Sequence, residues 1–250
     1  MPDPIPAPDI SSVRQDVKTA LAEDIGSGDC TAGLVPQGAR LETRVICRDT
    51  AVLAGQPWFD ETFSQVDSAV SMDWLLNDGG RMEPGQEICR LRGPARSILT
   101  GERTGLNFLQ TLSATATRTR RYVDAIAGTG AIILDTRKTL PGLRRAQKYA
   151  VLCGGGANHR IGLFDAVLVK ENHISAAGSI SAAVRAAQAN YPDLLLEVEV
   201  ENLAQLDEAA RAGAQRVLLD NFPPDLLREA VKRYKGTIGL EASGGIELDT

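Results

Sequence analysis

IILDTRKT, residues 132–139, joins a short apolar run to two adjacent cations. The run is typical of a buried strand, so we predict a strand over 131–135 that delivers charge to an edge. Apolar runs recur downstream at the spacing of alternating strands and helices, and each ends beside a polar or charged residue. They cover 166–170, 194–200, 216–220 and 238–242. Barrel strands present catalytic groups at their C-terminal ends in this way.

The segments between these runs have helical spacing. We expect helices at about 142–152, 179–190, 203–212 and 224–234. Strands that alternate with helices predict a parallel α/β barrel. The sequence stops at Thr250, where a further helix would begin, so we expect the last βα unit of the barrel to be missing.

The chain before this repeat is richer in turn residues, and its strand-like segments are short. Helices are expected at 10–22, near 58–65 and at 100–127. Short strands are expected at 43–47, 51–55, 70–76 and 87–92. We therefore predict a sandwich-like α+β N-terminal domain with a leading helix over residues 1–112. An α/β-barrel catalytic domain is predicted over 113–250.

Composition bounds the class of protein. With 250 residues, of which 43% are hydrophobic, the chain can bury a large core. No apolar run approaches the roughly 18 residues that span a bilayer, and the Pro-rich start lacks the features of a signal peptide. We therefore expect a cytoplasmic protein. The four cysteines are widely spaced and form no CxxC pair, so the sequence predicts neither a disulfide framework nor a zinc site.

Charge is unevenly distributed along the chain, although the net value is only −5. Residues 90–170 hold 14 basic and 4 acidic side chains, whereas both flanks are acidic. This pattern indicates a focused pocket for a small polyanion, because the flanks would repel a polynucleotide. We expect small-molecule substrates, with no nucleic acid and no membrane as partners. For any single Arg or Lys of the block, a solvated helix face is the alternative.

The predicted strand ends gather charged and polar residues on one rim. They are Arg137, Lys138, Lys170, Glu199, Asp220 and Ser243-Gly244-Gly245. Alternation in LEVEVE, residues 196–201, puts three glutamates on one face of a strand and two valines on the other. Burying three carboxylates requires cations opposite them. The candidates are Arg137, Lys138, Arg160 and Lys170. The alternative is an edge strand whose acidic face lies in water.

A glycine-rich loop, CGGGANHR at 153–160, ends in two hydrogen-bond donors, His159 and Arg160. Glycines allow close backbone approach, which suits an anion site with both donors beside it. A structural role for His159 is equally open, and Cys153 with His159 lacks the further ligands that a metal site needs. His173, which follows the strand-end Lys170, is expected to be structural.

Several cations beside a few carboxylates favour one kind of chemistry. Arginine forks bind carboxylate or phosphate oxygens, and carboxylates hold Mg²⁺ or the hydroxyls of a ribose. We predict transfer at the sugar carbon of a sugar phosphate, with Glu199 and Asp220 stabilising an oxocarbenium-like state. The cations would neutralise a diphosphate leaving group, and no side-chain nucleophile is needed.

Six motifs, in order along the chain, closely resemble the quinolinate phosphoribosyltransferase family, also called carboxylating nicotinate-nucleotide pyrophosphorylases. They are GERT (101–104), LDTRKT (134–139), GGGANHR (154–160), KENH (170–173), EVEVE (197–201) and LEASGGI (240–246). The resemblance implies a pentosyltransferase that joins quinolinate to 5-phosphoribosyl 1-diphosphate with Mg²⁺ as cofactor. It would release CO₂ and diphosphate and yield nicotinate mononucleotide for NAD synthesis.

The resemblance also implies roles for individual residues. Arg103 would reach the active site of the neighbouring subunit in a homodimer or dimer-based oligomer. The quinolinate carboxylates would be contacted by Arg137, His159, Arg160 and Lys170, with Thr136 as a further substrate-binding residue. The phosphates would be faced by Lys138, Lys170 and the turn Ser243-Gly244-Gly245. Glu199 and Asp220 would lie near the ribose and act on the metal through substrate or water. The implied catalytic residues are Lys138, Lys170, Glu199 and Asp220.

Other functions compete with this interpretation. Lys170 at a strand end could form a Schiff base in a lyase, although the neighbouring Glu171 and Glu199 favour its charged form. A non-catalytic binding or assembly subunit with the same fold is a second alternative. A paralogue with a phosphoribosyltransferase-like fold and a different role is a third.

Overall fold

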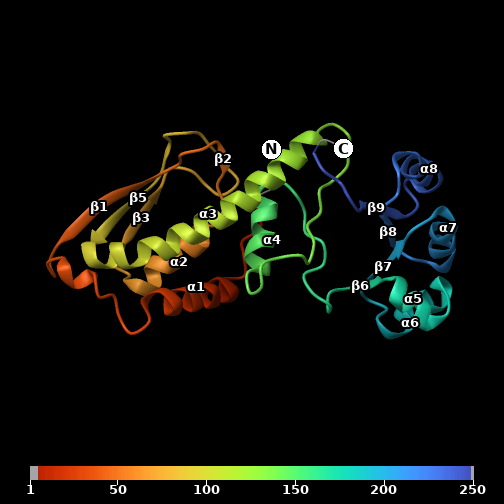
Figure 1. Ribbon diagram of the computed structural model, residues 1–250, viewed down its shortest axis with the longest axis horizontal. Helices are drawn as coiled ribbons and strands as arrows, with labels where there is room; N and C mark the ends of the chain where they lie inside the picture. Colours follow the sequence, from red (N-terminus) through yellow and green to blue (C-terminus); the bar gives the residue numbers. More distant parts are fainter. Residues whose placement is uncertain (1–4, 249–250) are drawn as a thin grey trace. The chain divides into compact units, whose positions relative to one another are not determined.

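The structure, a computed structural model, describes residues 5–248. The chain divides into two compact units, Met1–His159 and Arg160–Thr250, hereafter the N-terminal and C-terminal units (Figure 1). The domain boundary expected between residues 112 and 113 falls inside a long helix and stays a prediction. Within residues 5–248, no helix combines the length and the hydropathy that crossing a bilayer requires.

The N-terminal unit packs helices against a small antiparallel sheet. Its helices are α1 (Ile10–Ile25), the short 3-10 turn η1 (Ala32–Leu34), α2 (Gln56–Val66), α3 (Ala95–Ala125) and α4 (Arg144–Cys153). Its strands are β1 (Arg40–Ile46), β2 (Ala51–Val52), β3 (Ser71–Trp74), β4 (Arg81–Met82) and β5 (Glu87–Pro94). Strands β1, β5 and β3 form one sheet in that order, and β2 pairs with β4. The expected α+β character and leading helix are confirmed.

Two glycines let α2 pack closely against α3. A Cβ on Gly101 would lie 2.9 Å from Phe63 Cε1, and one on Gly105 would lie 3.0 Å from Phe59 Cδ2. Both phenylalanines are buried. Arg103, between the two glycines, is exposed. The GERTG stretch therefore gives α3 a tightly packed face and an exposed face that carries Arg103.

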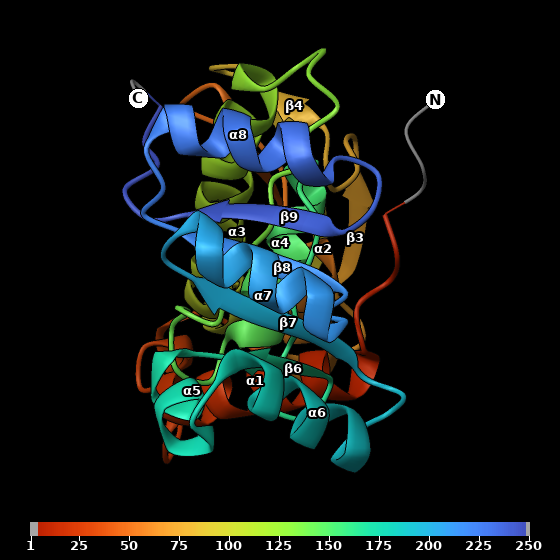
Figure 2. The same ribbon diagram turned by 90° about the vertical axis from the view of Figure 1, so that its right-hand side faces the viewer.

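The C-terminal unit alternates strands and helices around a parallel sheet (Figure 2). Its strands are β6 (Ala166–Val169), β7 (Leu195–Val200), β8 (Arg216–Asp220) and β9 (Gly239–Ser243), paired in that order. Its helices are α5 (Glu171–Ala177), α6 (Ile180–Asn190), α7 (Leu203–Ala212) and α8 (Pro224–Tyr234). Helices α6, α7 and α8 cover one face of the sheet. The parallel α/β domain is confirmed, and, as expected for an incomplete barrel, the four paired strands of the described residues form a sheet that does not close on itself.

The strand register gives this sheet one apolar face and one polar face. Val198 of β7 lies opposite Val217 of β8, and both belong to the hydrophobic cluster that includes residues of α6, α7 and α8. On the other face, Glu197 lies opposite Arg216. Glu197 is buried, with 1% of its surface exposed. The expected alternation of valines and glutamates along β7 is therefore present, and its acidic face does not lie in water at Glu197.

The apolar run at 131–135 was expected to be a strand, and the structure shows that this was wrong. It makes one isolated parallel bridge, between Leu134 and Ala157. Asp135 N donates to Ala157 O at 3.1 Å, and Ala157 N donates to Ile133 O at 2.8 Å. The glycine-rich loop pairs with this run only at Ala157. A pairing of this length does not extend into a ladder of hydrogen bonds, so the run is not a strand.

Candidate active site

The ends of four adjacent strands bring predicted site residues to one edge of the C-terminal sheet. Lys170 follows β6, Glu199 lies near the end of β7, Asp220 ends β8 and Ser243 ends β9. Asp220 and Ser243 are direct register partners. The two-residue period of the strands puts all four on the polar face. One cation, two carboxylates and a hydroxyl therefore share one side of this edge.

Lys170 and Glu199 form an ion pair, with 2.6 Å between Nζ and Oε2. The Glu199 side chain is 17% exposed, whereas the Lys170 side chain is 47% exposed. The lysine can therefore contact a solute while the glutamate holds it in place. His173 Nδ1 accepts a hydrogen bond from Lys170 N at 2.9 Å at the start of α5. This helix-capping contact agrees with the structural role expected of His173.

The chain turns sharply after β9, at Gly244 and Gly245. Their φ angles are 91° and 60°, a left-handed conformation that side chains with a Cβ rarely adopt. Both glycines are exposed. The turn presents accessible backbone at the same edge as Asp220, which is what a phosphate-binding turn requires.

In the N-terminal unit, the predicted residues Thr136, Arg137 and Lys138 share one tight turn. Lys138 N donates to Thr136 Oγ1 at 3.0 Å, and Thr139 N donates to Arg137 O at 3.1 Å. Arg144 of α4 donates to the same carbonyl at 3.4 Å. Arg137 Nε is buried and has no hydrogen-bond partner among residues 5–248. A buried guanidinium donor without an acceptor fits an anionic ligand.

Asp135 ties this turn to α4 and to the glycine-rich loop. Its carboxylate accepts hydrogen bonds from Lys148 Nζ, from Asn158 Nδ2 at 2.6 Å and from His159 N at 2.8 Å. Lys148 Nζ also donates to His159 O at 2.9 Å. The Lys148 and Asp135 side chains are 3% and 6% exposed, so the ion pair is buried. The pair fixes the backbone beside Arg137 and at His159.

The three glycines before His159 pack against α3. A Cβ on Gly154 would lie 2.5 Å from Ala116 O, and one on Gly156 would lie 3.0 Å from Thr119 Cγ2. The close approach that these glycines permit is thus used within the protein. The loop sets the position of His159 and is not open at Gly154 and Gly156 for an anion. Burial raises the pKa of the preceding Cys153 thiol to about 12, so this cysteine is no nucleophile near neutral pH.

The remaining two predicted arginines have different surroundings. Arg103 is exposed on α3 and forms no hydrogen bond or ion pair with another residue of the described chain. Arg160 Nη1 donates to Ala166 O at 3.2 Å, at the start of β6. The predicted contacts of both arginines with substrate stay predictions.

Two residues that organise these groups, Lys148 and Asn221, were not among the predicted site residues. Lys148 lies on the buried face of α4 beside Ala146 and Tyr149, and a single lysine on an apolar helix face was the available signal. Asn221 directly follows Asp220, the last residue of β8. An asparagine directly after a strand end can adopt a left-handed backbone, which was a weaker signal.

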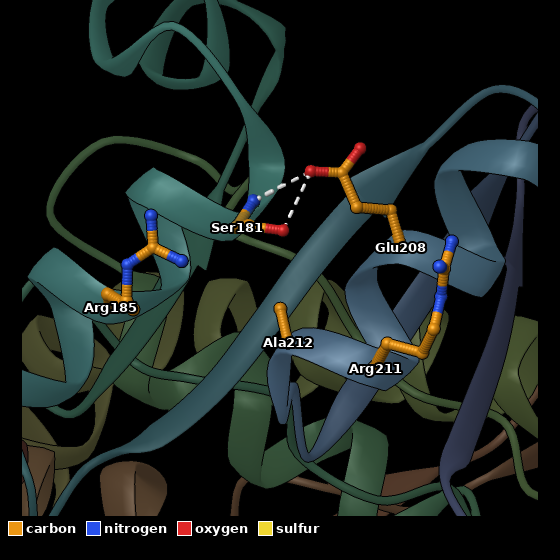
Figure 3. Close-up of a pocket in the computed structure, with 5 residues that line it drawn as sticks. All are labelled: Ser181, Arg185, Glu208, Arg211 and Ala212. Atoms are coloured by element: carbon orange, nitrogen blue, oxygen red, sulfur yellow. Dashed lines mark hydrogen bonds between the residues drawn. The ribbon is translucent and has the colours of Figure 1, made fainter.

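A pocket of about 510 Å³ lies between α6 and α7 (Figure 3). It is lined by Ser181, Arg185, Glu208, Arg211 and Ala212. Glu208 accepts hydrogen bonds from Ser181 N and Oγ, both at 2.9 Å, and these contacts hold its pKa below the ordinary value. None of the predicted site residues lines the pocket. The Glu208 carboxylate already accepts hydrogen bonds from Ser181, which is part of the pocket lining.

Comparisons with known proteins agree with each other. The family model described as quinolinate phosphoribosyl transferase, N-terminal domain, matches residues 26–113, and the corresponding C-terminal domain model matches residues 115–250. A probable carboxylating nicotinate-nucleotide pyrophosphorylase of Bacillus subtilis is 43% identical over 229 residues, covering 91% of this chain and 79% of the relative. The carboxylating enzyme of Mycobacterium leprae is 41% identical over 251 residues, covering 96% and 87%. The structure of the Francisella tularensis pyrophosphorylase has a TM-score of 0.92 and 44% identity, and the match covers 98% of this chain and 87% of that one.

Proposed function

Because this chain belongs to the quinolinate phosphoribosyltransferase family, we propose that it joins quinolinate to 5-phosphoribosyl 1-diphosphate with loss of CO₂. The products are nicotinate mononucleotide, diphosphate and CO₂, and the reaction supplies NAD synthesis. Relatives with 41–43% identity carry the name of this carboxylating pyrophosphorylase. The observation that supports the proposal in the structure is the edge where Lys170, Glu199 and Asp220 lie on one face.

Two bonds change in the proposed transfer. The pyridine nitrogen of quinolinate forms a bond to C1 of the ribose while the bond from C1 to the diphosphate oxygen breaks, and its electron pair leaves with diphosphate. Positive charge develops on the ribose, which Glu199 and Asp220 can stabilise. The bond from C2 to the carboxylate carbon then breaks, CO₂ leaves, and the electron pair of that bond stays on C2 beside the positively charged nitrogen. This pair takes a proton from water to form the C2–H bond, and hydroxide is released.

Quinolinate carries two carboxylates, and the proposed partners for them are cations. Arg137 supports this assignment because its Nε is buried without an acceptor, and a guanidinium matches carboxylate geometry. Thr136, His159, Arg160 and Lys170 are the other proposed contacts for quinolinate. Lys138, Lys170 and the turn at Ser243-Gly244-Gly245 are proposed to hold the phosphates.

Glu199 and Asp220 fit a Mg²⁺ ion that arrives with the diphosphate. One oxygen of each carboxylate is engaged by a neighbour, Lys170 for Glu199 and Asn221 for Asp220. The second oxygen of each is the hard donor that Mg²⁺ prefers. We infer that both carboxylates act through water or through the substrate. When bound, the ion would neutralise charge on the leaving diphosphate.

We further infer a homodimer or dimer-based oligomer in which Arg103 serves the neighbouring subunit. The supporting observation is the exposed guanidinium of Arg103, which has no partner within the described chain. We also place the reaction in the cytoplasm. The four cysteines are free thiols, as expected for a reducing compartment.

A Schiff-base lyase that uses Lys170 is less well supported, because its Nζ is engaged by Glu199 at 2.6 Å. Attack on a carbonyl requires an uncharged amine. Borohydride treatment in the presence of a carbonyl substrate would trap an adduct on Lys170 if this alternative were correct.

The direct test is an assay of purified protein with quinolinate, phosphoribosyl diphosphate and Mg²⁺. Quinolinate labelled in its C2 carboxylate should release labelled CO₂ in equal amount with nicotinate mononucleotide. Nicotinate, which lacks that carboxylate, is the control substrate and should give far less product. The proposed function would be refuted if the folded protein released no labelled CO₂ and formed no nicotinate mononucleotide.

A further inference from the structure

Asn221 has an unusual backbone conformation. Its φ is 55°, and within residues 5–248 no other non-glycine residue has a positive φ. A left-handed backbone is unfavourable for an L-residue, although asparagine tolerates it better than most. Strained positions of this kind cluster at functional sites. The contacts of the Asn221 side chain are therefore informative.

Three contacts join Asn221 to the predicted site residues at the ends of β8 and β9. Its Nδ2 donates to Asp220 Oδ2 at 2.9 Å, and its backbone N donates to Ser243 O at 2.9 Å. A Cβ on Gly244 would lie only 2.1 Å from Asn221 Oδ1, so the asparagine side chain lies directly against this glycine. One residue thus contacts a carboxylate, a strand end and a turn.

We propose that Asn221 is a positioning residue that holds the Asp220 carboxylate and the Ser243-Gly244 turn in one arrangement toward the phosphoribosyl donor. This inference rests on the proposed function of that edge. Asn221 does not touch the reacting atoms. Its amide engages one oxygen of Asp220, which directs the other oxygen toward ribose or Mg²⁺. The same side chain packs on Gly244, so carboxylate and phosphate turn are set together.

A purely structural explanation is that asparagine is present because it tolerates the turn. Glycine adopts a φ of 55° freely, so it would then replace Asn221 without loss. Aspartate has nearly the same shape and also tolerates this backbone, but its ionised side chain cannot donate a hydrogen bond. Both substitutions keep the backbone conformation of the turn and remove the hydrogen bond to Asp220, so they distinguish the effect of the one from the effect of the other.

The experiment compares Asn221→Gly, Asn221→Asp and wild type by steady-state kinetics, with thermal denaturation as the check on folding. We expect both variants to melt close to wild type. In both, kcat/KM for phosphoribosyl diphosphate should fall about 10- to 100-fold, the scale for a misplaced catalytic group. The equilibrium affinity for quinolinate should change less than twofold, since the contacts of Asn221 are to the donor side. Crystal structures of both variants should show Asp220 in a changed or mixed rotamer.

Wild-type kinetics in Asn221→Gly would overturn the proposal and leave Asn221 as a turn former. Unchanged Asp220 and Gly244 geometry in the two variant structures would overturn it as well. If wild-type protein forms no product at all, the proposed function fails instead. The Asp220 rotamer in the variant crystals still decides whether Asn221 positions it.

Discussion

At the scale of single residues, Arg137 offers the sharpest test of the substrate. Its Nε is buried without an acceptor, so an anion that reaches it gains a desolvated partner. Arg137→Ala should weaken quinolinate binding by about 2–5 kcal/mol, the range for removing one member of a buried charge pair. Isothermal titration of the purified variant with quinolinate measures this loss.

Arg145→Ala is the matched control, because Arg145 is exposed on α4 and lies 4.0 Å from Asp9 in an exposed ion pair. It should bind quinolinate like wild type. Equal affinity in the Arg137 and Arg145 variants would remove Arg137 from the quinolinate site. It would then have to be explained as a structural arginine.

Lys148 leads to a prediction about stability. Lys148→Met removes the cation from a buried pair and leaves Asp135 ionised with no charged partner. The free energy of unfolding should fall by about 3–5 kcal/mol. Urea denaturation measures it, and the KM for quinolinate should rise because Asp135 also holds His159 N.

The double variant Lys148→Met with Asp135→Asn should regain part of that stability, since the uncompensated charge is gone. A single variant as stable as wild type would mean that water solvates Asp135 when Lys148 is removed. A double variant that is less stable than Lys148→Met would show that the carboxylate matters chiefly for its bonds to Asn158 and His159.

Sequence reasoning at this scale succeeded where covalent geometry decides the outcome. Strand alternation alone put Glu197 and Glu199 on one face of β7, because side chains change sides at every residue. It could not find Lys148, whose importance comes from Asp135, a residue 13 positions away on a segment that is not a strand. Asn221 was missed for a related reason, since its role depends on the approach of β9.

At the scale of elements, Asp78 caps the start of α2. It accepts hydrogen bonds from Gly55 N, Gln56 N and Tyr149 Oη. Burial nevertheless raises the pKa of Asp78 above 3.8. The folded state therefore binds the proton more readily than the unfolded state, and ionisation of Asp78 lowers stability at neutral pH. Relative to Asp78→Asn, wild type should gain stability as the pH falls from about 7 to about 4.

The comparison requires urea denaturation of both proteins at several pH values. Asp67→Asn is a control of opposite sign, because Ser97 Oγ and Ala69 N hold the pKa of Asp67 below its usual range. Wild type should lose stability relative to that variant on acidification. A pH-independent difference between wild type and Asp78→Asn would contradict the assigned effect of burial.

Elements with an internal period were predicted well. The expected 203–212, 216–220 and 224–234 coincide with α7, β8 and α8. Each has an apolar stripe that its own sequence reveals. The strand predicted at 131–135 is absent because a strand needs a partner along its length, and within residues 5–248 the run makes a single bridge, from Leu134 to Ala157. Helix α5 was missed because ENHISAA has no apolar period and begins at the contact between Lys170 and His173.

At the scale of the whole molecule, Arg103 connects activity with assembly. If Arg103 serves the neighbouring subunit, each active site takes Arg137 from one subunit and Arg103 from the other. Arg103→Ala and Arg137→Ala then inactivate a site through different subunits. Mixing the two inactive proteins under conditions of subunit exchange should restore up to about a quarter of wild-type activity per site, the statistical yield of mixed dimers whose one site is intact.

Sedimentation analysis confirms that exchange has occurred, and each variant mixed with itself serves as the control. Exchange without any recovery of activity would place Arg103 in its own subunit or outside the site. A monomer at assay concentration that is fully active would refute the proposed sharing.

The order of the parts was predictable at this scale, because each part has its own sequence pattern. Repeated strands and helices predicted the parallel sheet, and turn-rich short strands predicted the separate α+β part. The alternation predicted an incomplete barrel, and the paired strands of the described residues form a parallel sheet that does not close on itself. The family resemblance rests on six motifs and their order along the chain, which local periodicity does not encode.

The two-faced register of β7 has a consequence for how this protein can vary. Val198 and Val200 belong to the hydrophobic core, while Glu197 and Glu199 occupy the other face. Substitutions at odd and even positions of this strand therefore act on chemistry and on folding separately. A one-residue deletion within the strand would exchange the two sets, placing carboxylates in the core and valines at the reactive edge. Natural length variation should consequently be confined to the loops, where inserted residues leave this parity intact.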